Sequence, residues 1–160
     1  MSDWINDGIN RMSVQQKAVN AQHQAEVHAR DIVLAKQAEW FVRLMDDIER
    51  VCVTVTQRVA GTPAAFVLET KRGPGGIAIS RSGDPSASAQ LRRTPLAYTM
   101  TLFVAGSSAL RTKSHQNSVT VELGGSNTGE LAAVLQGREY AEPTWSSLAE
   151  ALVKMVAFPA

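Results

Sequence analysis

The stretch from Ser13 to about Arg50 has no helix breaker, and it constrains the fold more than any other feature of the chain. It contains neither glycine nor proline, and Ser13 with Gln16 has the spacing of a helix-capping box. In its second half apolar residues recur at helical spacing on one broad face, whereas in the first half the same face becomes polar. We therefore predict one long helix over residues 13–50, with only its second half lying on a core.

Such a helix is too long for the domain that carries it. At 1.5 Å per residue it extends for roughly 55 Å, whereas a compact domain of this size has a diameter near 40 Å. An isolated overhang is marginally stable in water, because helices gain most of their stability by packing one face. We expect a second chain, or residues 1–12 folded back, to cover it. The apolar residues expected to make such contacts are Trp4, Ile5, Ile9 and Val27.

Beyond Arg50 the apolar period changes from 3.6 to 2. Valines alternate with polar residues over 51–59, and similar patterns occur over 66–71, 77–81, 96–105, 118–123 and 130–139. The last of these segments could instead be a short helix. Residues 82–95 and 106–117 are rich in loop-forming residues, and an amphipathic pattern over 144–158 predicts a closing helix.

The order of these segments predicts an α+β fold. Because most connections between the strands are too short for crossovers, the five or six strands should form an antiparallel meander, with both helices on one face. The domain organisation expected is a short N-terminal segment, 1–12, and a single α+β domain, 13–160. Within that domain we expect a helix at 13–50, a sheet at 51–140 and a helix at 144–158.

The composition is that of a soluble globular protein, with 44% hydrophobic and 19% charged residues among 160. No apolar run approaches the roughly 18 residues of a transmembrane helix, so no transmembrane segment is expected. The N-terminus lacks the apolar region of a secretory signal, and the single cysteine, Cys52, has no intramolecular disulfide partner. These features predict a cytoplasmic location.

The chain contains no recognisable catalytic, metal-binding or cofactor-binding set of residues. His23 and His28 are five residues apart on the predicted helix, about 140° from each other, so they do not converge on a metal. Cys52 has no nearby paired histidine in the sequence and is expected to be a small structural residue. Asp46 and Glu49 lie one turn apart on the charged outer face, where salt bridging or plain solvation is expected. We therefore predict no metal, no cofactor and no catalytic residue, although catalysis stays open.

A basic tip is a candidate anion site. The net charge is only +1, yet residues 51–115 hold 8 Lys/Arg against 2 Asp/Glu. If the turn at 73–76 and the loop at 106–117 lie at the same end of a meander, their cations gather there. The residues of this candidate are Lys71, Arg72, Arg111, Lys113 and His115. Aromatic residues that could stack on bases are absent from this tip, so nucleic acid is less favoured than an acidic protein.

We predict a non-catalytic interaction or adaptor protein that forms a homo-oligomer, most simply a dimer, through its long N-terminal helix. Its expected partners are a second copy of itself and another protein. A different class, a small-ligand module or enzyme, would need a pocket between helices and sheet. Its candidate lining residues are Trp40, Tyr98, Met100 and Trp145. Anion or nucleic-acid binding at the basic tip is the third alternative.

Overall fold

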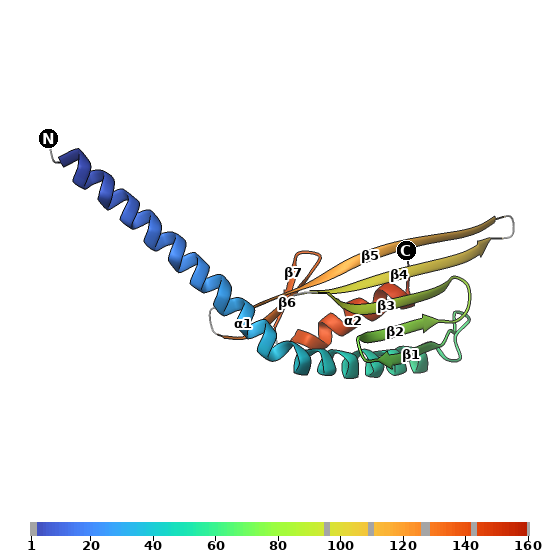
Figure 1. The fold of residues 1–160 in the computed structure, drawn as a ribbon. Helices are drawn as coiled ribbons and strands as arrows, with labels where there is room; N and C mark the ends of the chain where they lie inside the picture. Colours follow the sequence, from blue (N-terminus) through green and yellow to red (C-terminus); the bar gives the residue numbers. More distant parts are fainter. Residues whose placement is uncertain (1–2, 95–96, 109–110, 126–128, 142–143, 160) are drawn as a thin grey trace.

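The computed structural model describes residues 3–94, 97–108, 111–125, 129–141 and 144–159. Its elements follow one another along the chain as α1 (Asp3–Val59), β1 (Leu68–Gly73), β2 (Gly76–Arg81), β3 (Ser86–Thr94), β4 (Ala97–Ser108), β5 (Arg111–Gly125), β6 (Leu131–Leu135), β7 (Arg138–Tyr140) and α2 (Trp145–Ala157). The seven strands form one antiparallel sheet in chain order, β1 to β7 (Figure 1). The predicted α+β class and meander are confirmed, with seven strands rather than five or six.

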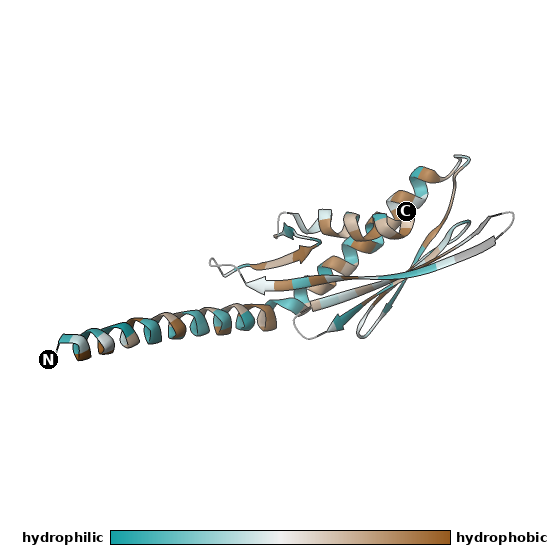
Figure 2. Ribbon diagram, turned by 90° about the horizontal axis from the view of Figure 1, so that it is seen from above, coloured by the Kyte–Doolittle hydropathy of each residue, from teal (hydrophilic) through white to brown (hydrophobic). Residues whose placement is uncertain are grey.

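Both helices lie on one side of this sheet (Figure 2). Residues at alternate strand positions, such as Ile77 and Ile79 of β2, are buried beneath them, while their neighbours face outward. This alternation follows from the period-2 geometry of a strand. The largest fully buried side chains come from both layers and include Trp40, Tyr98, Leu44, Ile48, Leu148 and Leu152.

Helix α1 is longer at both ends than the sequence predicts. The described helix begins at Asp3 and ends at Val59. Residues 3–12 therefore belong to the helix and do not fold back. The strand predicted at 51–59 is wrong, because these residues are helical. Cys52 is buried, and Val51, Val55 and Val59 pack against the core at four-residue spacing. This packing overrides the preference of valine for strands, which is a weak effect by comparison.

The predicted loops at 82–95 and 106–117 are largely strand. β3 occupies the first of them, with Ala87, Ala89 and Leu91 buried between exposed polar residues. Alanine is small and has a low β-propensity, so the alternation of alanines with polar residues in this segment indicates a strand only weakly. The second predicted loop holds the end of β4 and the first half of β5. Residues 130–139 form the β6–β7 hairpin.

The first 26 described residues of α1 project beyond the sheet, as Figures 1 and 2 show. Every residue from Asp3 to His28 is exposed, and we call this segment the arm. It extends for about 40 Å at 1.5 Å per residue. The first partly buried residue is Ala29, where Gly125 at the end of β5 approaches so closely that a Cβ there would lie 2.9 Å from the Ala29 Cα atom. Gly125 therefore marks the place where the arm leaves the domain.

Candidate functional site

The arm exposes a set of large apolar side chains. The four residues predicted to make contacts are all exposed, by 71% at Trp4, 45% at Ile5, 57% at Ile9 and 44% at Val27. Met12, Val14 and Val19 are exposed as well. Scattered apolar residues are normal on a protein surface, but a concentration on one projecting element marks an interaction site.

Much of this apolar surface follows a seven-residue repeat. Ile5, Met12 and Val19 are seven residues apart, and the same spacing leads through Glu26 to Val33 and Trp40. The latter two are buried under the sheet, with exposed fractions of 2% and 1%. This heptad position is thus open along the arm and covered by the domain at Val33 and Trp40, and it becomes polar at Asp47 and Thr54.

The companion heptad position has a different chemical character. It begins with Ile9, continues through Gln16, His23 and Arg30, and returns to an apolar residue at Leu44. Two such positions, four and three residues apart, form the seam of a coiled coil. Polar residues in a seam lower its stability but restrict the register and number of helices that fit. The seam of the arm is therefore apolar near the N-terminal tip and largely polar near the domain.

The residues of the predicted basic tip are not brought together. Gly73 pairs with Gly76 and Thr94 pairs with Ala97 at one end of the sheet, whereas Ser108 pairs with Arg111 at the other. Because residues 86–94 form an additional strand, the direction of every later strand is reversed relative to the expectation. Lys71 and Arg72 consequently lie at the opposite end from Arg111, Lys113 and His115.

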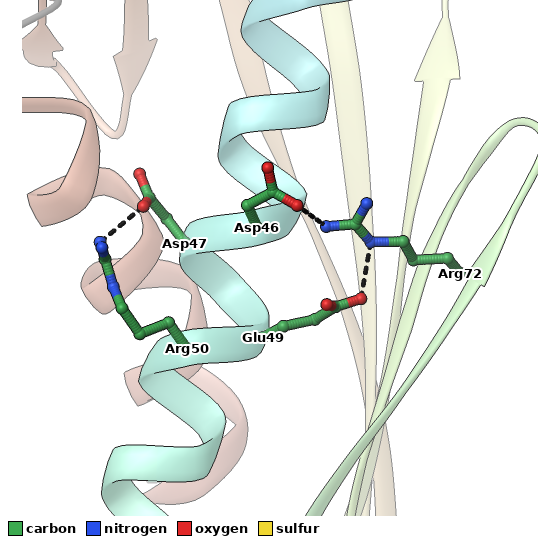
Figure 3. Close-up of polar contacts among 5 residues, drawn as sticks. All are labelled: Asp46, Asp47, Glu49, Arg50 and Arg72. Carbon is green, nitrogen blue, oxygen red and sulfur yellow. Dashed lines mark hydrogen bonds and ion pairs between the residues drawn. The ribbon is translucent and has the colours of Figure 1, made fainter.

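Arg72 is held by two carboxylates of α1, as Figure 3 shows. Its Nε donates to Glu49 Oε1 at 2.6 Å, and its Nη2 atom donates to Asp46 Oδ1. The hydrogen bond to Asp46 is the main cause that raises the pKa of Arg72 above its ordinary value. The expected salt bridging of Asp46 and Glu49 is therefore observed. It ties the edge strand β1 to α1 and neutralises much of the charge of Arg72.

A second group of cations is found at the end of the sheet where Lys71 lies. Lys71, Arg92 and Arg93 border an open hollow of about 540 Å³ beside the β1–β2 turn, together with Arg72. No carboxylate is among the described residues that line it. The alternation of buried and exposed residues over 86–94 is the sequence signal of β3, which brings Arg92 and Arg93 to this end of the sheet.

The four residues of the predicted ligand pocket contribute mainly to the core. Trp40 and Tyr98 have ring centroids 5.2 Å apart, and Phe41 stacks on Tyr98 at 4.3 Å. Trp40, Tyr98 and Met100 are each at most 2% exposed. Trp40 and Trp145 border a surface hollow of about 140 Å³. Ring contacts thus fill the space between α1 and the sheet at this point, which argues against a shared ligand pocket there.

The described residues offer no group of three or more side chains that could hold a metal. His23 and His28 project from the exposed arm.

Cys52 is buried, and desolvation, aided by the charge of Glu49, raises the pKa of its thiol to about 11. A thiol that stays protonated is a poor nucleophile. Neither described helix has a stretch apolar enough to cross a membrane.

No family model, curated protein or solved structure matches the chain.

Proposed function

We propose that the protein is an assembly module that forms homo-oligomers, most simply dimers, by pairing of the arm with the arm of a second copy. The observation that carries the proposal is the exposed heptad seam of residues 3–28, which continues a seam buried in the domain. A second copy is the favoured partner because it supplies an identical seam, with the same spacing and the same apolar tip.

The energetics of an isolated arm support this proposal. A helix in water gains little from its own hydrogen bonds and depends on burial of an apolar face. The arm contains Gly8, which lowers helix stability by roughly 1 kcal/mol relative to alanine. A length of 26 residues covers between three and four heptads, which is the range in which a coiled-coil seam becomes recognisable. Pairing would cover Trp4, Ile5 and Ile9 and stabilise the helix that presents them.

Substitution of a seam residue provides the test. Ile9→Glu places a charge in the proposed interface and should raise the dissociation constant of the oligomer by at least about tenfold. Val14→Glu is the matched control, since Val14 is 67% exposed. It lies about 180° around the helix from the midpoint between Ile9 and Met12, on the face opposite to the seam. Light scattering coupled to gel filtration measures the mass of each variant. Equal masses for the two variants, or no loss with Ile9→Glu, would contradict the proposal.

A second candidate function is anion binding in the basic hollow beside the β1–β2 turn. It is supported by the cations of Lys71, Arg92 and Arg93 around a hollow without a lining carboxylate. Phosphate and sulfate groups are the ligands that guanidinium groups hold best. Arg72 contributes less, because Asp46 and Glu49 already engage it.

Heparin binding at increasing salt concentration tests this second function. The variant with Arg92→Gln and Arg93→Gln should elute from a heparin column at lower salt than the unmodified chain, whereas Arg138→Gln should not change the elution. Arg138 lies on β7, at the far edge of the sheet. An elution position that is the same for all three proteins rules the hollow out as an anion site.

A further inference from the structure

Half of strand β5 is an open edge. β4 pairs with β5 along its whole length, but β6 pairs only with Val121–Gly125. Within the described part of the chain, no strand lies beside residues 114–120 on that side. Figure 1 shows β6 and β7 only at the end of β5 nearest the arm. The backbone N–H and C=O groups along an open edge can pair with another extended chain, and proteins usually protect such edges.

A groove runs beside this edge, between the sheet and α2. It has a volume of about 480 Å³, within the range of roughly 300–1,000 Å³ that is typical of binding sites. Its sheet side is formed by Met100, Leu102 and Val119, which share the helix-facing side of β4 and β5. Its other wall consists of Met155 and Phe158 at the end of α2. Phe158 is 58% exposed, so this wall offers apolar surface to an incoming side chain.

The polar residues of the groove favour an acidic occupant. His115 and Lys154 line it, together with the uncharged Asn117 and Gln136, and no carboxylate is among its described lining residues. Both His115 and Lys154 are exposed. A carboxylate in the groove would therefore meet two cations and, among the described lining residues, no carboxylate.

The same features disfavour a second copy of β5 as the occupant. Residues 111–120 contain Arg111, Lys113 and His115 and no acidic residue, so two such edges would repel each other when paired. A helix is a poor occupant as well, because its backbone groups are already paired within the helix and cannot bond to a strand edge. An extended segment satisfies both the edge and the apolar groove.

We propose that the groove between β5 and α2 binds an extended acidic segment of another protein by strand addition. The segment pairs with residues 114–120 of β5, in line with β6, and places alternate side chains in the groove. Its apolar side chains contact Leu102, Met155 and Phe158, and its carboxylates approach Lys154 and His115. This site is separate from the arm, and its failure would leave the proposed assembly function unaffected.

The probe is a fluorescein-labelled, amidated seven-residue peptide with glutamate at both ends, valine at the third and fifth positions and threonine at the even positions. Its order is symmetrical, so it can bind in either direction, and reversing the direction exchanges the set of amides that faces β5. Three further peptides carry N-methyl groups on the amides of the odd residues, of the even residues, or of all seven residues. In a bound strand one set faces β5 and the other faces away.

Fluorescence anisotropy with the full chain at low ionic strength should show saturable binding of the probe. The fully N-methylated peptide should bind at least about tenfold more weakly than the parent, because neither direction leaves amides that can bond to the edge. Each half-methylated peptide should bind more tightly than the fully methylated one, because it can still turn its free amides to β5. Equal binding of the parent and the fully methylated peptide, or no saturable binding, would overturn the proposal. Release of protein monomers from a dimer by the probe would show that a second copy occupies the groove, and would overturn it too.

Charge reversal tests the assigned cation. Lys154→Glu should weaken probe binding by about tenfold and should permit binding of a peptide with lysine in place of glutamate. Recovery with the lysine peptide excludes unfolding as the cause. Lys36→Glu is the control, because Lys36 is exposed, lies on α1 and borders neither the groove nor the basic hollow. An equal loss of binding in both variants would indicate general charge attraction and would contradict the groove site.

Discussion

Gly125 is the residue that permits α1 to lie against the end of β5. A Cβ at this position would be 2.9 Å from the Ala29 Cα and 3.0 Å from the Ala29 carbonyl oxygen, so the backbone of one element must move. Gly125→Ala should lower the free energy of unfolding by about 1–3 kcal/mol, the usual cost of overpacking. Gly124→Ala is its control, because a Cβ on Gly124 would meet no atom within 4 Å. Urea denaturation compares the two, and equal stabilities would contradict this account of the contact.

Cys52 gives the protein a predictable sensitivity to alkaline pH. Burial raises the pKa of its thiol from 9.0 to about 11, so the unfolded chain loses this proton before the folded chain does. The resulting stabilisation is fully present below pH 9 and disappears as the pH rises towards 11.

The difference in unfolding free energy between the unmodified chain and Cys52→Ala should therefore shrink between these pH values. Denaturant titrations at several pH values measure it. A difference that stays constant from neutral pH to pH 11 would show that the thiol is not protected in the fold.

At the scale of elements, the Arg72 ion pairs connect the edge strand β1 to α1. The guanidinium is partly exposed, and so are Asp46 and Glu49, so their contribution to stability is modest. Arg72→Gln should lower the free energy of unfolding by about 0.5–1 kcal/mol, and the loss should be smaller in high salt. Arg92→Gln, on β3, is the comparison. A double-mutant cycle with Asp46→Asn that shows no coupling would exclude an energetic role for this pair.

The arm should associate more strongly when its intrinsic helicity rises. Gly8→Ala adds a Cβ that meets no atom within 4 Å and stabilises the helix by roughly 1 kcal/mol. Because helix formation and pairing are coupled and a dimer contains two such helices, the dissociation constant of the dimer should fall by about thirtyfold. Ala18→Gly is the opposite change and should weaken association to a similar extent. Circular dichroism at several protein concentrations reports both effects, and an unaltered dissociation constant would contradict the coupling.

The sequence predicts those elements whose apolar pattern is strong. The long helix, the closing helix and β4 are each marked by several large apolar residues at one period, and all three are present. The strand predicted at 51–59 failed because the alternating valines also place Val51, Val55 and Val59 on one helical face. In this segment the contact between the helical face and the core determines the structure. A local sequence pattern does not contain this information.

The positions of the candidate sites depend on the order and direction of the strands. One strand missing from the prediction therefore changes which residues are expected to lie together. Of the residues expected to make contacts, Val27 lies on the predicted helix, whereas Trp4 and Ile9 belong to the part of α1 that precedes its predicted start at residue 13. The basic tip does not form, because β3 reverses the direction of every later strand. The open edge of β5 was treated as loop, since residues 112–117 are polar on both faces and carry no apolar alternation.

For the whole molecule, the two proposed interaction surfaces lie far apart. The arm leaves the domain beside Gly125, and the groove lies towards the other end of β5, near His115 and α2 (Figure 1). Pairing of arms would therefore leave the grooves accessible. An oligomer with two or more grooves would bind a partner with repeated acidic segments more tightly than a single domain does, because the second contact is intramolecular.

The oligomeric mass of the unmodified chain tests the central claim most directly. Sedimentation equilibrium over about 1–100 µM should give a mass that rises from that of one chain, 17.2 kDa, towards a whole multiple of it, as mass action requires. Hydrogen exchange on the same samples should show protection of residues 3–28 that increases with concentration. A mass of 17.2 kDa throughout, with the arm exchanging equally fast at every concentration, would contradict assembly through the arm.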